Sequence, residues 1–425
     1  MRQVWSHIQP SLLALLFTCA LAPVAWGTQA NPLVFLHYWS GPLGGGVDEM
    51  VQAYNRASPD YKVHASAFDH ESFKVSIKAM LASDSPPDIF SYWAGAKVRA
   101  LVAGNHLAPI DEVWNESKLY DVFPSSIANA CTYFGHKYAL PVTQHYVGFF
   151  YNKKIFDQYH LEPPINWEEF LATCEKLKNA GITPLALGSK ERWPAQFWFD
   201  YLLLRTAGPE FRHRLMDGKV SYNSPEVAMV FEEWKSLMYA DYFNSSPNLM
   251  DWTDAASMVH SGSAAMTLMG TWVIGYFQDQ LKWKQETDFD FFPFPLMDRS
   301  VPATSVGPID VMVVSRKGRN QEVNAILAFF SDPGPQMEMS SGSGALSPSR
   351  AIPPGFYTKL QRRILETIRN TPNWAFNYDL ATPPEVADLG LDAFKLFLYN
   401  PKEYRQIIIE LDKKAEAYFN NSAPN

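Results

Sequence analysis

The chain has 425 residues, 47% of them hydrophobic and 19% charged, with a formal net charge of −8 at pH 7. This balance excludes an intrinsically disordered chain, and the length predicts two or three domains. The negative charge and the lack of any Lys/Arg run argue against nucleic acid or an anionic membrane surface as a partner.

The first residues have the features of an export signal. Arg2 supplies a positive charge, and residues 12–22 form an apolar stretch that is too short to cross a membrane comfortably. Small residues follow, so we expect cleavage after Gly27 or Ala30 and a periplasmic mature protein. An uncleaved N-terminal anchor and a lipid anchor on Cys19 are the alternatives, although the residues before Cys19 fit a lipoprotein signal poorly.

Short apolar stretches then alternate with helical patterns. Residues 33–38 and 61–63 have the composition of strands, and residues 88–90 form a third short strand after a Pro-Pro pair. Between them, apolar residues recur at helical spacing within 47–54 and within 73–81. This β-α-β-α-β order predicts a parallel sheet with right-handed crossovers.

The alternation resumes after residue 165. Asn166 is suited to cap a helix, with Glu169 completing a capping box, and Gly181 ends that helix. Ser224 followed by Pro225 begins another helix. Further strands are predicted at 183–187, 264–268 and 309–314, and a further helix at 325–330.

Two extended segments have the character of connections between lobes. Residues 139–151 are apolar without a helical period, and residues 288–302 contain three prolines, which bar a continuous helix or a central strand. Neither segment has the Gly/Ser composition of a flexible linker. Both fit a hinge between two lobes that share the chain, although two sequential domains would have the same composition.

Motifs of several enzyme classes are missing from the sequence. It contains no phosphate-binding loop, no H-E-x-x-H zinc helix and no G-x-S-x-G nucleophile elbow. The histidines do not cluster at metal-ligand spacing, and His64 and His70 suggest a surface loop. Carboxylates are plentiful, so a glycosidase pair remains open. Cys131 and Cys174 are left in the mature chain, either paired or as two buried thiols.

Tryptophans follow several of the predicted strands. Trp39 comes directly after the first strand, Trp93 after residues 88–90, and Trp272 after the strand that ends at Gly270. Ligands of open α/β sheets bind outside the carboxyl ends of strands, and a flat indole suits the C–H face of a sugar ring. Each tryptophan alone is more consistent with packing in a loop or core, but several of them placed after strands weaken that interpretation for the set. Trp193 and Trp252 lie in polar loops.

Several segments resemble one family, the extracellular solute-binding proteins of carbohydrate ABC importers, which includes maltose-binding protein. The resemblance runs over nearly the whole mature chain. Its most specific part is Tyr-Asn-Lys at 151–153 followed by Trp-Glu-Glu-Phe at 167–170. The other segments that carry it are 54–59, 87–90, 135–141, 264–272 and 307–310.

This resemblance implies an α/β fold of two lobes joined by a hinge. Each lobe would be a mostly parallel sheet flanked by helices. The implied division places a signal peptide in 1–30, the N-terminal lobe in 31–143 and 296–340, and the C-terminal lobe in 144–295 and 341–425. Ligand binding would close the cleft between the lobes.

The resemblance also implies a sugar or small oligosaccharide as ligand, membrane permease subunits as partners and a monomeric protein without catalysis, cofactor or metal. The ligand-binding residues would be Trp39, Ser91, Trp93, His145, Trp252, Trp272, Asp310 and Arg350. His145 would equally suit a structural role, and Arg350 would serve a sugar acid or a phosphate.

Other ligands and another class of protein remain open from the residues alone. A sugar acid, a glycerophosphate compound or a polyamine would suit the same fold. A secreted carbohydrate-active enzyme with an aromatic cleft is the alternative from a different class.

Overall fold

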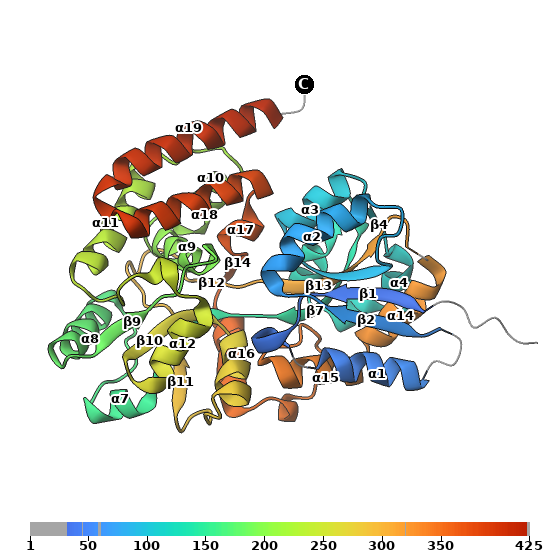
Figure 1. Cartoon of the computed structure of the whole chain (residues 1–425), viewed down its shortest axis with the longest axis horizontal. Coiled ribbons are helices and arrows are strands. Elements are labelled where there is room, and N and C mark those ends of the chain that lie inside the picture. The colour runs from blue at the N-terminus through green and yellow to red at the C-terminus, as the bar shows by residue number, and fades with distance from the viewer. Residues whose placement is uncertain (1–31, 45, 58–60, 319, 423–425) are drawn as a thin grey trace, which may run out of the picture. The chain divides into compact units, whose positions relative to one another are not determined.

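The computed structural model describes residues 32–44, 46–57, 61–318 and 320–422. The predicted export signal and Cys19 lie outside these residues. Across the described ranges, no helix is long and apolar enough to span a bilayer. Two hydrophobic cores, each built around one sheet, organise this part of the chain. We call them the first and the second lobe (Figure 1).

The sheet of the first lobe has six strands, and one of them runs against the others. β1 pairs in parallel with both β2 and β3, whereas β13 is antiparallel to its partners β3, β4 and β7. The predicted β-α-β-α-β unit is therefore confirmed, and β13 is a reversed addition to it. The strands are β1 (Leu33–His37), β2 (Val63–Ala67), β3 (Ile89–Trp93), β4 (Leu107–Ala108), β7 (Ala139–Gln144) and β13 (Ile309–Ser315).

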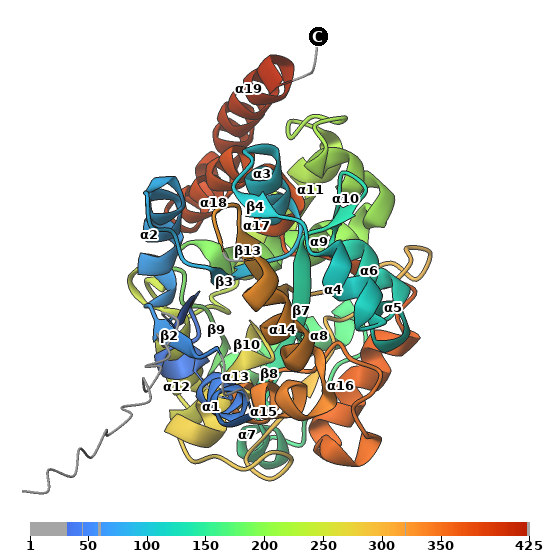
Figure 2. The same ribbon diagram turned by 90° about the vertical axis from the view of Figure 1, so that its right-hand side faces the viewer.

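Helices cover the first sheet in the way that the apolar spacing predicts. In α1 (Val47–Ala57), Val47, Met50, Val51 and Tyr54 are buried. α1 packs beside α15 (Pro333–Ser343), from far along the chain (Figure 2). The other helices named below in this lobe are α2 (His70–Ala82), α3 (Ala96–Ala103) and α14 (Asn320–Ser331).

The sheet of the second lobe has four strands in the order β11-β8-β10-β9. β10 pairs in parallel with β9 and antiparallel with β8, which also pairs antiparallel with β11. Here β8 is the reversed strand. The strands are β8 (Val147–Asn152), β9 (Thr183–Ala186), β10 (Ala264–Gly270) and β11 (Phe289–Phe292).

Local capping defines the helices of the second lobe. Asn166 accepts the Glu169 N–H at the start of α8 (Trp167–Asn179), as predicted, but the Glu169 carboxylate reaches back to the Ile165 N–H and not to that of Asn166. Ser224 caps α11 (Pro225–Tyr239). Other helices of this lobe are α9 (Gln196–Thr206), α12 (Trp252–Ser261), α13 (Trp272–Gly275), α17 (Tyr378–Ala381), α18 (Pro384–Tyr399) and α19 (Tyr404–Ser422).

The chain passes between the lobes more than once. β7 leads through His145 and Tyr146 into β8, so the predicted extended connection at 139–151 joins the two sheets. The return differs from expectation, because 289–292 form β11 and pair with β8. Val306 still belongs to the second core and Ile309 to the first, so this connection lies at 307–308. The lobe boundaries implied by the family resemblance stay a prediction.

The two cysteines of the described chain are free thiols. Cys131 lies in the first core and Cys174 in the second, so the alternative of a disulfide is wrong. Burial raises the pKa of Cys131 to about 12, which keeps it protonated and unreactive.

Candidate functional site

A cavity lies where the carboxyl ends of the parallel strands of both sheets meet. The free space between its side chains is about 700 Å³, part of it open to solvent, which is in the range of small-molecule sites. The cavity is lined by Tyr38, Trp39, Leu43, His70, Lys74, Trp93, Lys97, Thr143, His145, Trp193, Gln196, Trp272, Pro308, Asp310, Asn377, Asp379 and Leu380.

The wall on the first lobe is formed by strand ends. Tyr38 and Trp39 follow β1 directly, and Trp93 is the last residue of β3. Because β13 runs the other way, its second residue, Asp310, lies opposite Trp93 and Thr143 at the same edge. The reversed strand thus places a carboxylate where parallel strands expose their carboxyl ends.

Asp310 is the polar centre of this wall. Its carboxylate accepts a hydrogen bond from the Thr143 hydroxyl at 2.7 Å and lies 3.2 Å from Nε2 of His145. Burial acts to raise the pKa of Asp310, but the hydrogen bond and charge of His145 and the hydroxyl of Thr143 outweigh it, so the pKa lies below its usual value. His145 also contacts Thr271 Oγ1 through Nδ1 at 2.9 Å and therefore links the two lobes.

The wall on the second lobe is aromatic. Trp272 begins α13 just after β10, and its ring lies against Gly270, where an added Cβ would come within 2.0 Å of the indole. Trp193 stands nearly perpendicular to it, with ring centroids 5.7 Å apart and an interplanar angle of 67°. Nε1 of Trp272 and Oδ1 of Asn377 are both buried without a hydrogen-bond partner. Both residues line the cavity.

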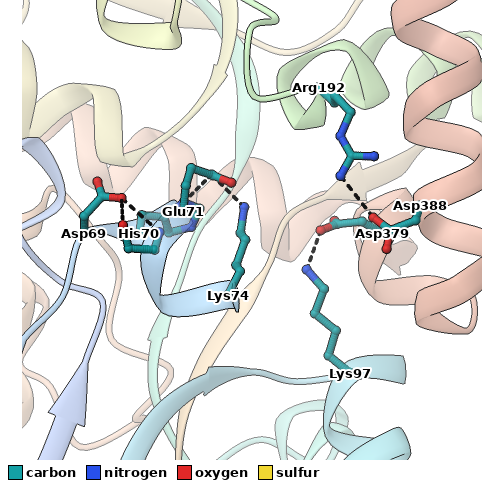
Figure 3. A network of polar contacts seen from close by, with 9 residues as sticks. Asp69, His70, Glu71, Lys74, Lys97, Arg192, Asp379 and Asp388 are labelled. Carbon is teal, nitrogen blue, oxygen red and sulfur yellow. Dashed lines mark hydrogen bonds and ion pairs between the residues drawn. The ribbon is translucent and has the colours of Figure 1, made fainter. Parts of the chain in front are cut away.

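The charges around the cavity are paired (Figure 3). Nζ of Lys74 lies 2.8 Å from the Glu71 carboxylate within α2. Nζ of Lys97, on α3, lies 2.6 Å from Asp379 on α17, so this pair joins the lobes. Lys97 Nζ also sits 4.8 Å from the centroid of Trp93. A charge-balanced cavity of this kind suits an uncharged ligand.

His70 is the first residue of α2 and faces the cavity, so the prediction of a surface loop at this position is wrong. Burial lowers the pKa of His70 to about 4, and the neighbouring Lys74 adds to this shift against the opposing effect of Glu71. The ring is therefore neutral near pH 7. It contacts the rings of Trp93 and Trp193, which belong to different lobes.

Five of the predicted site residues line the cavity: Trp39, Trp93, His145, Trp272 and Asp310.

The other three lie elsewhere. Ser91 is fully buried, and its Oγ accepts the Tyr38 N–H. Trp252 packs against Tyr276, and Arg350 is exposed in a separate groove. Ser91 is thus engaged by the backbone of the residue after β1, and Trp252 by a neighbouring ring of its own lobe.

Sequence reasoning missed most of the polar lining. Lys74 and Lys97 lie on helices that follow or precede strands, without any local motif, and Asp379 and Asn377 are distant in sequence from the strands that they approach. Trp193 carried a usable signal, because it is a tryptophan in a polar loop. The remaining residues had no sequence signal that distinguishes them from surface positions.

A model of the bacterial extracellular solute-binding protein family matches residues 40–337. The chain belongs to this family. A cavity lined by aromatic and polar side chains agrees with the solute binding for which the family is named.

Individual relatives and structures support the assignment. The chain is 28% identical over 351 residues to an uncharacterized ABC transporter extracellular-binding protein of Pyrococcus horikoshii, covering 81% of this chain and 77% of that one. It is 30% identical over 295 residues to a probable sugar-binding periplasmic protein of Mesorhizobium japonicum, covering 68% and 70%. The solved structure of the bacterial solute receptor AcbH, described as preferring β-D-galactopyranose, superimposes with a TM-score of 0.84 at 24% identity, covering 92% and 98%.

Proposed function

We propose that this protein is the substrate-binding component of an ABC importer and that it captures a sugar between its lobes. The observation that carries the proposal is the edge-to-face pair of indole rings of Trp193 and Trp272, together with the unpartnered indole N–H of Trp272. An indole face packs against the C–H face of a sugar ring, while directed polar atoms bind its hydroxyl groups. The name of the Mesorhizobium japonicum relative supports the same ligand class.

The charges of the cavity favour a neutral sugar over the alternatives. Lys74 and Lys97 each have a carboxylate partner, so neither offers an unpaired cation for a sugar acid or a glycerophosphate compound. Asp310 and Asp379 are in turn paired with His145 and Lys97, which leaves no free acidic cluster for a polyamine. A charged ligand would have to break one of these pairs, of which Lys97–Asp379 and His145–Asp310 lie largely out of solvent.

The same pairing supports binding without catalysis. A glycosidase needs one carboxyl group with a raised pKa to act as general acid. For Asp379 burial acts to raise the pKa, but the charge and hydrogen bond of Lys97 outweigh it, and the pKa lies below its usual value. Asp310 is shifted in the same direction. Both carboxyl groups of the cavity are thus ionised near pH 7, and neither is suited to donate a proton.

The two-lobed fold suggests the order of steps by which the sugar would be delivered to the permease. Sugar binds to the open form, contacts both walls and favours closure, and permease subunits in the membrane recognise the closed form. We propose that the protein acts as a monomer in the periplasm after cleavage of the predicted signal. N-terminal sequencing of the protein from periplasmic extracts, and light scattering of the purified chain, test these two points.

A thermal-shift panel tests the ligand class. The mature chain is heated with neutral sugars, sugar acids, glycerophosphodiesters and polyamines. A ligand that binds only the folded form adds about 2.7 kcal/mol of stability at 100 times its Kd. A raised midpoint with a neutral sugar, without consumption of that sugar, is the expected result. A shift with only anions or polyamines, or turnover of a glycoside, would overturn the proposal.

A further inference from the structure

We propose that the cavity holds a single neutral sugar ring and that the Lys97–Asp379 ion pair sets this limit. The inference rests on the proposed function and narrows its ligand from sugars in general to monosaccharides.

One series of contacting side chains runs along the cavity from the first lobe to the second. On the first lobe, Tyr38 stacks on Trp93 with centroids 4.3 Å apart, and Lys97 Nζ lies over the same indole at 4.8 Å. Lys97 then crosses to Asp379, whose backbone N–H donates to Gln196 Oε1 at 2.9 Å. This series of contacts connects β3 of the first lobe to Gln196, at the start of α9 in the second lobe.

A second series of contacts returns from the second lobe to the first. Trp193, three residues before Gln196, meets Trp272 at 5.7 Å, and Trp272 meets the ring of His145 at 5.2 Å. His145 returns to Asp310 on the first lobe at 3.2 Å. These two series of contacts line opposite sides of the cavity, and Asp310 lies opposite Trp93 in the register of β13 and β3.

The backbones of two segments approach closely beside the Lys97–Asp379 ion pair. Gly95, directly before α3, has φ of +101°, and a Cβ at this position would lie 2.3 Å from the carbonyl oxygen of Leu380 on α17. Only glycine allows this approach. The α3–α17 side of the cavity is therefore closed by backbone as well as by Lys97 and Asp379 (Figure 3). A second sugar unit could leave on this side only by separating the pair.

Two buried polar atoms that have no hydrogen-bond partner suit a ligand that carries hydroxyl groups. Nε1 of Trp272 is a donor and Oδ1 of Asn377 an acceptor, and both residues are more than nine-tenths buried. Buried polar groups without a partner are costly, so a ligand that fills the cavity would stabilise them. A sugar ring carries hydroxyl groups that donate and accept around its whole edge. The proposal places the edge of such a ring beside Trp272 and Asn377, which both line the cavity.

Isothermal titration with the unmodified protein is the first test. D-glucose, D-galactose, D-mannose, D-xylose and L-arabinose are compared with maltose, cellobiose, lactose and xylobiose. We expect at least one monosaccharide to bind and every disaccharide to bind at least about 100-fold more weakly, because the buried pair must open. A disaccharide that binds as tightly as the best monosaccharide would overturn the size limit and leave the proposed function standing. Binding of no sugar would overturn both.

The double variant Lys97→Ala/Asp379→Ala tests the role of the ion pair. Removing both charges avoids an unpartnered buried ion. We expect the ratio of disaccharide to monosaccharide affinity to rise by at least about tenfold. Arg192→Ala is the matched control, because Arg192 also pairs at 2.6 Å with a helix of the second lobe, through Asp392 on α18, but lies outside the cavity lining. An unchanged ratio in the folded double variant would overturn the assignment, and the titration of the unmodified protein decides the size limit if the variant does not fold.

Discussion

On the first lobe, the charged side chains that face the cavity are already paired, whereas the second lobe presents an indole N–H and an amide oxygen that have no partner. Trp93 is covered by Tyr38 on one side and approached by Lys97. Asp310 is held by Thr143 and His145. Across the cavity, Trp272 keeps a free indole N–H.

This difference assigns distinct roles to the two walls. The first wall is preorganised, since its charges are paired before a ligand arrives. Its side chains therefore need little rearrangement when the cleft closes on a ligand. The second wall supplies the atoms that are stabilised only when a ligand is present. Disrupting the first wall should therefore affect stability and binding together, and disrupting the second should affect mainly binding.

The largest effect is expected for Asp310→Ala. The substitution leaves Thr143 and His145 without their buried partner, so we expect a loss of about 3 kcal/mol in the free energy of unfolding and at least about 100-fold in sugar affinity. Urea denaturation and isothermal titration measure the two effects. The exposed Asp298, whose carboxylate accepts hydrogen bonds from Ser300 in its own loop, serves as the control. Asp298→Ala should keep the affinity unchanged and lower the free energy of unfolding far less than Asp310→Ala does. Normal affinity in Asp310→Ala would refute the role of the first wall.

The second wall is tested by Trp272→Ala, with Trp252→Ala as a matched control. Both tryptophans are 8% exposed and begin a helix, but only Trp272 lines the cavity. A stacked aromatic contributes about 0.5–1.5 kcal/mol beyond burial, so Trp272→Ala should weaken sugar binding by about tenfold or more. Trp252→Ala should lower stability and keep the affinity within about twofold. Equal losses of affinity in the two variants would contradict the separate roles of the walls.

An acid-induced loss of stability is expected from His70. Its pKa is about 4 in the folded chain against an ordinary value of 6.5, so below pH 6.5 the unfolded chain binds a proton that the folded chain does not. The contribution of neutral His70 is complete above pH 6.5 and is lost as the pH falls to about 4, by about 2 kcal/mol given its partial exposure. Urea midpoints at pH 7.5 and 4.5 measure the change. His70→Gln should show a smaller acid loss than the unmodified chain, and identical losses would contradict this assignment.

The smallest effect is expected for Arg350→Ala. Arg350 is exposed in a groove apart from the cavity, so sugar affinity should stay within about twofold of the unmodified chain. Titration with the sugar found in the thermal-shift panel checks this. A larger loss would restore Arg350 as a ligand-binding residue, as the family resemblance implied.

Much of the fold was readable from local pattern. Strand and helix periods depend on residues that are close in sequence, so the β-α-β-α-β unit, the Asn166 cap and the connection through 139–151 were predictable. The return connection was not predictable, because the prolines of residues 288–302 carry no sign that 289–292 pair as a strand with β8. The pairing of β11 with β8 joins segments more than a hundred residues apart.

The sequence by itself determined which residues end the strands, and therefore that Trp39, Trp93 and Trp272 would stand at the edge where ligands bind. Only the tertiary structure decided what faces them. Lys97 meets Asp379 across 282 residues, and Asp310 meets His145 because β13 runs against its neighbours. Such contacts arise from the packing of distant segments, which leaves no local mark in composition or spacing, and they determine the charge and size of the ligand that the cavity accepts.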